Sequence, residues 1–291
     1  LYRRLWQPLA VAALNTAAED GSARLLRRVL AETLGRGAAA CRPLVARDGL
    51  SESLVDPALA FLARHDCAVR FGARLRAIDF AAERATALRF DGETVPLAPT
   101  EAAILAVPAA VAARLVPGLV VPDDYAPIVN AHFRCALPPS APRLVGIVGG
   151  TAEWVFKKRE IASVTVSAAD RLVDRPADDL AQLLWRDVAR IIGLPTAPMP
   201  PCRIVKERRA TFRATPAQLR RRPPSVTRWN NFLLAGDYVE TGLPATIEGA
   251  IRSGFAAAAR VRRGLAPAPA GPAVAAARRS TADEDCQRAL P

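Results

Sequence analysis

One stretch near the C-terminal end of this 291-residue chain restricts its possible folds more than any other. The segment FLLAGDYVETGLPATIEGAIRSG, residues 232–254, has the pattern of a short buried strand, a glycine turn with one carboxylate, and a proline before a helix. Gly236 allows the backbone to approach a phosphate closely, where a Cβ atom would obstruct it. We predict that Pro244 lies in the first turn of the helix, where a missing N–H has no cost.

The helix that this segment begins is predicted to run from about residue 245 to residue 263. Its first N–H groups have no partner within the helix and carry a partial positive charge of about half a unit. Such a helix end binds an anion or an electron-rich carbonyl. Asp237 either caps the turn, which is ordinary chemistry for Asp after Gly, or contacts the ligand, and its context favours the ligand.

The N-terminal third of the chain is predicted to be largely helical. Apolar residues recur at three- and four-residue spacing over 5–34, which indicates two helices broken near 15–16. A further helix is predicted over 52–65, with Ser51 as its N-cap. Residues 67–97 have the pattern of short strands separated by glycine-containing turns.

The rest of the chain alternates between strands and helices. The apolar run EAAILAVP, which ends at Pro108, predicts a strand covered on both faces, and an alanine-rich helix follows it. Strands are predicted over 127–167, a helix over 178–192, and a strand over 202–212 that leads into a basic, proline-rich loop.

Because the strand-rich and helix-rich parts alternate twice, we predict an α/β fold of two interleaved domains. One domain would contain residues 66–121 and 229–263. The other, an α+β domain with an antiparallel sheet, would contain residues 1–65 and 122–228. The Pro/Ala-rich remainder, 264–291, lacks hydrophobic periodicity and is predicted to be disordered.

The chain is basic, with a formal net charge of +12. Its arginines are scattered, and the one compact run, 220–222, stands beside two prolines without interleaved aromatic residues. No nucleic-acid-binding motif is present, so we predict no nucleic-acid partner. A solvated basic face is the simpler interpretation of the charge, and contact with anionic lipid is the main functional alternative.

Five widely spaced cysteines, no CxxC pair and two histidines predict neither a metal site nor a disulfide framework. Scattered free thiols suit a reducing compartment, which indicates the cytoplasm. No apolar run reaches the ~20 residues that span a bilayer, and the start shows no signal-peptide pattern. Because the chain begins at Leu1 rather than Met, we expect a truncated product.

The segment 232–254 resembles the C-terminal FAD signature of the amine oxidase and phytoene desaturase superfamily. That resemblance implies that Gly236 and Asp237 contact the pyrophosphate and ribityl chain of FAD. It also implies that the amide of Ile247 faces the isoalloxazine carbonyl next to N1. The position of Thr246, beside the ring, is commonly an aromatic wall of the amine pocket in amine oxidases, so a threonine argues against an amine substrate.

Two earlier segments resemble other parts of the same superfamily. VRFGARLRAI resembles the strand pair that holds the adenine end of FAD, with Leu75 supplying main-chain N–H and C=O groups. AAILAVPAAVAARL resembles the later flavin-domain strand, with Pro108 close to the cofactor. The first domain would thus be an incomplete FAD-binding, Rossmann-like domain. The only near match to its usual GxGxxG turn, GRGAAA at 35–40, follows a predicted helix instead of a strand, so we expect poor FAD binding by this chain alone.

A narrower resemblance is to the hydroxysqualene dehydroxylases of hopanoid synthesis. It is carried by the stretches LWQPLAVAALNT, YAPIVNAHF, AEWVFKKREIASVTVSAAD and VKERRATFRATP. It implies reductive dehydroxylation of a long, apolar isoprenoid by reduced flavin, in a cytoplasmic protein peripherally associated with the membrane. A carotenoid or phytoene-type desaturase and a non-catalytic truncated remnant remain as alternatives. Neither the residues nor the resemblance identifies a catalytic residue, a proton donor, an electron donor or the oligomeric state.

Overall fold

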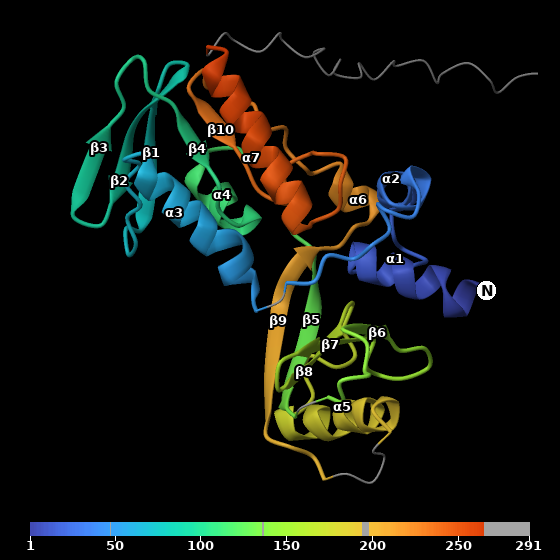
Figure 1. Ribbon diagram of the computed structural model, residues 1–291. Helices are drawn as coiled ribbons and strands as arrows, with labels where there is room; N and C mark the ends of the chain where they lie inside the picture. The colour runs from blue at the N-terminus through green and yellow to red at the C-terminus, as the bar shows by residue number, and fades with distance from the viewer. Residues whose placement is uncertain (47, 136, 194–197, 265–291) are drawn as a thin grey trace, which may run out of the picture.

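The computed structural model describes residues 1–46, 48–135, 137–193 and 198–264. Most of the tail expected at 264–291 therefore lies outside the described residues. Two long antiparallel strands, β5 (Tyr125–Arg134) and β9 (Cys202–Phe212), run from the upper part of the molecule into the lower part (Figure 1). They connect two groups of elements that each have a hydrophobic core.

The lower part is a five-stranded antiparallel sheet in the order β6-β7-β8-β5-β9. Alternate residues of β5, such as Val129, Ala131 and Phe133, are fully buried, as expected for a sheet with one face on a core. Helix α5 supplies the other half of this core, and its Trp185 ring lies 5.2 Å from the ring of Phe133. The remaining elements here are β6 (Leu144–Gly146), β7 (Trp154–Lys158), β8 (Ile161–Val166) and α5 (Ala177–Ile191).

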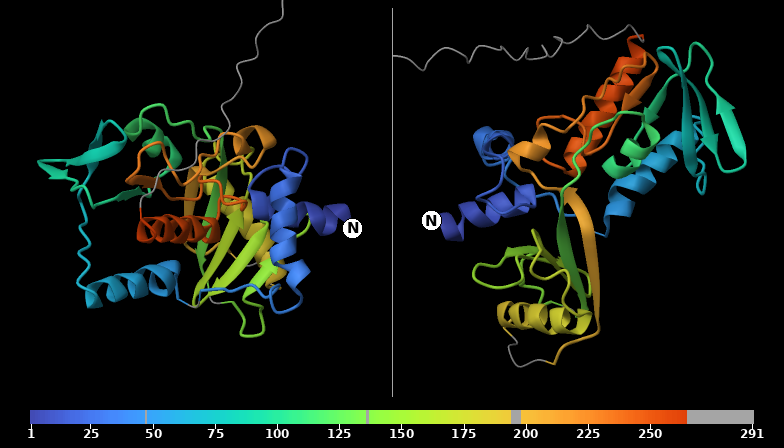
Figure 2. Two further views of the ribbon diagram at one scale, coloured as in Figure 1. Left: turned by 90° about the horizontal axis from the view of Figure 1, so that it is seen from above. Right: turned by 180° about the vertical axis from the view of Figure 1, so that it is seen from behind.

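Two N-terminal helices, α1 (Trp6–Leu14) and α2 (Ala23–Glu32), lie over the side of the sheet away from α5 (Figures 1 and 2). This confirms the two predicted helices and the break between them. Asn15, in the left-handed conformation, ends α1 and ties it to the sheet. Its side-chain amide donates to the carbonyl of Ala126 (3.1 Å) and accepts from the N–H of Ala168 (2.6 Å).

The upper part contains an antiparallel three-stranded sheet, β1-β2-β3, and a parallel pair, β4 and β10. Asn231 joins the two, because its side chain exchanges hydrogen bonds with the N–H and C=O of Ala85 (2.8 and 2.9 Å). The bounds are β1 (Leu75–Ala81), β2 (Arg84–Phe90), β3 (Glu93–Pro96), β4 (Ala103–Leu105), α4 (Ala109–Leu115), α6 (Pro216–Leu219), β10 (Phe232–Leu234) and α7 (Ile247–Arg262).

The mixed fold with antiparallel sheets agrees with the predicted α/β class. There are two main hydrophobic cores, and the first contains residues from both predicted domains. Leu14 and Leu25, from the helical part assigned to the second domain, pack into the core of the first domain beside Phe232 and Tyr238. Helices α1 and α2 therefore contact both parts of the molecule, and the domain boundaries stay a prediction.

Two local predictions were wrong. The helix over 52–65 begins as a π-helical turn, Ser51–Val55, and continues as α3 (Asp56–Arg64), so Ser51 does not cap it. Residues 67–74 form no strand, since Phe71 is 81% exposed and no neighbouring strand pairs with this stretch. Short 3-10 turns at Tyr2–Arg4 and Leu34–Arg36 complete the described elements. None of the described helices is both long enough and apolar enough to cross a membrane.

Candidate functional site

Gly236 forms the corner between β10 and the loop that leads to α7. Its φ of +140° lies in the region that side chains disfavour, and an added Cβ would come within 2.8 Å of the Tyr238 ring. Its N–H donates to the hydroxyl of Ser253 on α7 (2.7 Å). The corner therefore requires glycine and is fastened to the helix that follows it.

The parallel strands β4 and β10 bring Pro108 and Gly236 to one edge of the sheet. Leu234 is in register with Leu105, and the N–H of Ala235 donates to the Leu105 carbonyl (3.0 Å). Pro108 then starts α4. In open α/β sheets, ligands bind outside the carboxyl ends of the strands, which is the edge that these two residues occupy.

A buried arginine holds the loop after the corner. The Arg222 side chain has no exposed surface, and its guanidinium donates to the carbonyls of Leu243 (2.6 Å), Asp237 (3.0 Å) and Tyr238 (3.3 Å). It also donates to the carbonyl of Val239, and its guanidinium carbon lies 5.1 Å from the centre of the Phe212 ring. The loop 237–243 thus wraps around one planar cation, which fixes its main chain.

Sequence reasoning missed this role, because it assigned the whole run 220–222 to a solvated basic face. That interpretation fits Arg220, which is exposed, but it is wrong for Arg222. Burial lowers the pKa of Arg222, with Glu240 and Asp237 opposing the shift. A signal did exist, because Arg222 stands three residues after the buried Leu219 and directly before Pro223.

The next two residues place polar groups inside the corner. Asp237 is half-buried, and burial raises the pKa of its carboxyl, an effect that Arg222 partly offsets. Tyr238 is 1% exposed, and its hydroxyl has no hydrogen-bond partner among the described residues. Burial also raises the pKa of Tyr238. A buried unpaired hydroxyl is rare in proteins, and beside a glycine corner it suits a site that receives a polar ligand.

Helix α7 begins later than predicted. Thr246 has extended backbone angles, and its hydroxyl accepts from the N–H of Gly249 (3.1 Å), which makes it the N-cap. Pro244 lies outside the helix, so its predicted place in the first turn was wrong. The amides of Ile247 and Glu248 follow the cap and have no partner within the helix, so they can bind an electron-rich oxygen.

Leu75 lies at the start of β1, where it is half-buried against the same core as Tyr238. A register irregularity between Leu75 and Ala77 interrupts the pairing with β2. Such bulges free main-chain groups and are frequent next to binding sites. The predicted role of the Leu75 main chain at the adenine end of FAD remains a prediction.

An apolar cavity of about 560 Å³ lies between helices α1 and α2 and the sheet. Its walls include Leu26 and Leu30 of α2 and Ile128, Trp154 and Phe156 of the sheet. This volume is within the usual range of about 300–1,000 Å³ for small-molecule sites. Sequence reasoning did not predict this cavity, because its walls come from segments that are far apart in the chain.

Helix α2 links this cavity to the glycine corner. At one end, Arg24 pairs with Glu240 of the loop (3.4 Å). At the other end, Glu32 accepts from the guanidinium of Arg252 on α7 (3.3 and 3.4 Å), and this hydrogen bond lowers the pKa of Glu32. The same helix that lines the apolar cavity is therefore anchored beside the start of α7.

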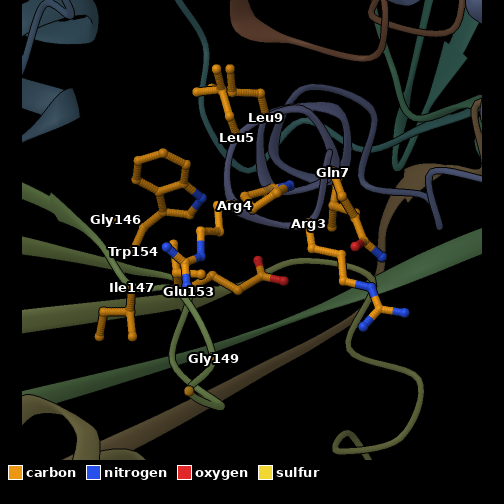
Figure 3. A pocket seen from close by; sticks show the side chains of 14 residues that line it. Arg3, Arg4, Leu5, Gln7, Leu9, Gly146, Ile147, Gly149, Glu153 and Trp154 are labelled. Carbon is orange, nitrogen blue, oxygen red and sulfur yellow. The ribbon is translucent and has the colours of Figure 1, made fainter. Parts of the chain in front are cut away.

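A second pocket, of about 350 Å³, shares Leu9 and Trp154 with the apolar cavity. Figure 3 shows Glu153 pointing into it, together with Arg3 and Arg4. The Glu153 carboxylate accepts a hydrogen bond from the N–H of Ser167 (2.8 Å). Burial raises the pKa of Glu153, and its hydrogen bonds to Ser167 partly offset this effect.

The described residues contain no cluster of His, Cys, Asp and Glu side chains that could hold a metal ion. Four of the cysteines are described and are unbridged, and Cys41 lines the apolar cavity.

Residues 2–262 match the family described as flavin containing amine oxidoreductase. The chain belongs to this family. A flavin is accordingly the cofactor of this family, and FAD is the form that the sequence predicted. Binding of FAD at the glycine corner stays a prediction. The structure fits it: a corner that admits no Cβ, a half-buried Asp237 and the free amides at the start of α7 suit a diphosphate and a ring carbonyl.

Three similar proteins carry the same assigned name. The hydroxysqualene dehydroxylase of Rhodopseudomonas palustris is 53% identical over 259 residues, which is 89% of this chain and 62% of that protein. The hydroxysqualene dehydroxylase of Zymomonas mobilis is 43% identical over 258 residues, again 89% and 62%. This chain thus spans less than two thirds of the length of the curated relatives that it matches.

Solved structures support the fold. An oxidoreductase from Methanosarcina mazei aligns with a TM-score of 0.65 at 11% identity, covering 87% of this chain and 63% of its own. A putrescine oxidase with a redesigned cofactor site aligns with a TM-score of 0.59 at 17% identity, covering 88% and 63%. At such low identity the likeness concerns the architecture alone.

Proposed function

We propose that this chain forms the flavin- and substrate-binding part of an enzyme that converts hydroxysqualene to squalene in hopanoid biosynthesis. The relatives that carry this name are 43–53% identical to it over 89% of its length. The observation that carries the proposal is the apolar cavity of about 560 Å³ that α2 anchors to the glycine corner. A long hydrocarbon needs such a cavity, because each Å² of apolar surface removed from water contributes about 25 cal/mol.

The residues of the corner have distinct parts in this function. Arg222 fixes the loop main chain, so that Asp237 and Gly236 keep their positions. The free amides at the start of α7, with the positive end of the helix dipole, would stabilise negative charge on a reduced flavin ring. When bound, the flavin supplies hydride chemistry, and the protein supplies binding, orientation and exclusion of water.

The residues around the cavity favour an isoprenoid over an amine. Thr246 replaces the aromatic wall that the resemblance associates with amine substrates, and it serves as a helix cap instead. The walls of the cavity are mainly apolar and include Leu30, Ile128 and Phe156, which suits a hydrocarbon chain. These features support a substrate with one polar group on a long apolar chain.

Product analysis tests the proposal. The chain is incubated without oxygen with FAD, a chemical reductant and hydroxysqualene, and the extract is analysed for squalene by mass spectrometry. We expect squalene only when protein, FAD and reductant are all present. Squalene production at the protein-free rate, in samples where flavin absorbance shows that FAD is bound, would contradict the proposal.

The two alternatives have their own readouts. A carotenoid-type desaturase would instead oxidise phytoene when supplied with oxidised FAD, which the same extraction would reveal. A non-catalytic remnant would show no flavin absorbance after FAD is added and the excess removed. The feature that favours the remnant is that GRGAAA, at 35–40, lies in a 3-10 turn and loop with no strand before it.

We also propose a cytoplasmic location with peripheral membrane association, because a squalene-sized substrate partitions into lipid. The net charge of +12 supports contact with anionic headgroups, each nearby Lys or Arg contributing about 1 kcal/mol. The protein should sediment with phosphatidylserine vesicles at low salt and be released at high salt. Failure to sediment at low salt would contradict this part of the proposal.

A further inference from the structure

Glu153 places one carboxyl group in two pockets that adjoin the apolar cavity. It precedes β7, directly before Trp154, whose ring lines both the apolar cavity and the pocket of Figure 3. Its partner Ser167 also lines the apolar cavity, and a third pocket of about 560 Å³ is lined by Glu153 and Ser167 together. Glu153 thus lines two pockets, and each of them shares lining residues with the apolar cavity.

The carboxyl group has hydrogen-bonding capacity to spare. Among the described residues it bonds with Ser167 alone, through the main-chain N–H (2.8 Å) and the hydroxyl. A carboxyl group offers up to four acceptor positions when ionised, and one O–H donor when protonated. A ligand hydroxyl that reached from the apolar cavity into these adjoining pockets could therefore bond to Glu153 without displacing a protein partner.

The surroundings favour the protonated form of Glu153. Burial raises its pKa, and no charged side chain forms an ion pair with it among the described residues. Arg213 is occupied by Asp124 (3.1 Å) and Asp170 (2.5 Å), and Arg3 and Arg4 are exposed, so solvent screens them. The charged residues that line the two pockets around Glu153 are Arg3, Arg4, Glu19, Asp170, Arg171 and Arg213.

We propose that Glu153 binds the hydroxyl of the isoprenoid substrate and donates the proton with which that hydroxyl leaves as water. This inference rests on the proposed function. The O–H bond of Glu153 breaks and a new O–H bond forms on the substrate oxygen. The allylic C–O bond then breaks with its electron pair on the departing water, and a bound, reduced flavin would supply the hydride that the carbon requires. Glu153 is left ionised and regains its proton from solvent.

Ligand binding tests the first half without any flavin. Trp154 lines the cavity, so its fluorescence reports binding of hydroxysqualene or squalene delivered from cyclodextrin, and W154F verifies the source of the signal. We expect this chain to bind hydroxysqualene about five-fold more tightly than squalene, the effect of one net hydrogen bond. The E153L variant should lose this preference. Its retention in a folded E153L protein would overturn the proposal.

The E153Q variant separates binding from proton donation. An amide still bonds to a hydroxyl but supplies no acidic proton, so the preference should stay within about two-fold while squalene formation falls by at least about 100-fold. The wild-type rate of squalene formation should fall as pH rises through the pKa of Glu153. The rate of E153Q should show no such fall. Glu160 is exposed in the turn after β7, and E160Q is the matched control that should change neither property.

The outcomes keep this inference distinct from the proposed function. Squalene formation by E153Q at the wild-type rate would overturn the role of Glu153 and leave the dehydroxylase proposal intact. A second outcome is a hydroxyl preference that depends on Glu153, together with no squalene from any variant that binds FAD. This outcome would contradict both the dehydroxylase proposal and proton donation by Glu153. The role of Glu153 in binding the hydroxyl would remain. If E153L fails to fold by circular dichroism, E153Q and the pH profile decide.

Discussion

The glycine corner and the apolar cavity are adjacent but are built in opposite ways. The corner is made of main-chain groups from one continuous segment, 236–247, held by a single buried cation, Arg222. The cavity is made of side chains from the N-terminal helices α1 and α2 and from strands of the sheet, which lie far from these helices in the sequence. The corner therefore depends on backbone conformation at a few positions, whereas the cavity depends on how whole elements pack.

This difference determines how each region should respond to substitution. Single changes at the corner disturb many hydrogen bonds together, because the carbonyls of four loop residues share the guanidinium of Arg222. Changes in the cavity wall should mainly alter ligand preference, since an apolar wall has no partner groups to leave unsatisfied. The following predictions test the contrast, beginning with the largest expected effect.

The G236V substitution should be the most damaging change at the corner. It places a Cβ 2.8 Å from the Tyr238 ring at a φ of +140°. We therefore expect the free energy of unfolding to fall by about 4 kcal/mol, and FAD binding to be lost. Thermal denaturation and flavin absorbance measure the two effects. Gly254, in α7, has open space around its Cβ position, and G254A should stabilise by about 0.5–1 kcal/mol.

The R222M substitution should destabilise the protein by about 3 kcal/mol. It leaves the buried carbonyls of Leu243 and Val239 without their donor, and buried unpaired acceptors cost about 1–3 kcal/mol each before relaxation. Denaturant unfolding gives the value. The exposed Arg220 is the control, and R220M should stay within about 0.5 kcal/mol of wild type. A loss under about 1 kcal/mol for R222M would show that the loop holds its shape unaided.

The T246A substitution should cost about 1 kcal/mol, the usual value of a lost N-cap. The comparison variant T100A removes an exposed threonine from a turn and should be close to neutral. If the free amides of α7 bind the flavin ring, T246A should also weaken FAD binding through fraying of the first turn. Unfolding curves with and without FAD separate the two effects.

The E153Q substitution should raise the free energy of unfolding, by less than the preceding substitutions change it, and only at higher pH. Because the folded-state pKa of Glu153 lies above its unfolded value, the folded protein binds the proton more tightly. Ionising the buried Glu153 lowers the stability of the folded protein. This penalty is absent below the unfolded-state pKa and grows as pH rises toward the folded-state pKa. Above the folded-state pKa the penalty is constant. The difference between E153Q and wild type in unfolding free energy should follow this course. A difference that does not change with pH would contradict it.

The Y238F substitution should have the smallest effect on the protein without FAD, within about 0.5 kcal/mol of wild type. It removes a buried hydroxyl that has no partner among the described residues. If that hydroxyl bonds to the cofactor, Y238F should weaken FAD binding several-fold while leaving unfolding unchanged. A clear loss of stability without FAD would show that the hydroxyl has a protein partner in solution.

The sequence by itself predicted the corner and the course of most elements. Gly236, Asp237 and the following helix were found because a conformation reserved for glycine and a helix start both require particular residue types at particular spacings. The same logic located β1, β2, β5 and α5, whose apolar periodicity is strong. It placed the start of α7, predicted at about residue 245, two residues before the observed start at Ile247. Pro244 and Thr246 are both acceptable near a helix start, and only the backbone angles of Thr246 distinguish them.

Only the tertiary structure decided the burial of Arg222, the apolar cavity and the position of Glu153. Only its position directly before Pro223 and three residues after Leu219 distinguishes Arg222 from Arg220 in the sequence, and its partners are carbonyls, which every residue has. The cavity walls become neighbours only when α1 and α2 fold over the sheet, and nothing local marks that contact. Backbone conformation is a local property that residue types encode, whereas burial depends on which distant segments meet.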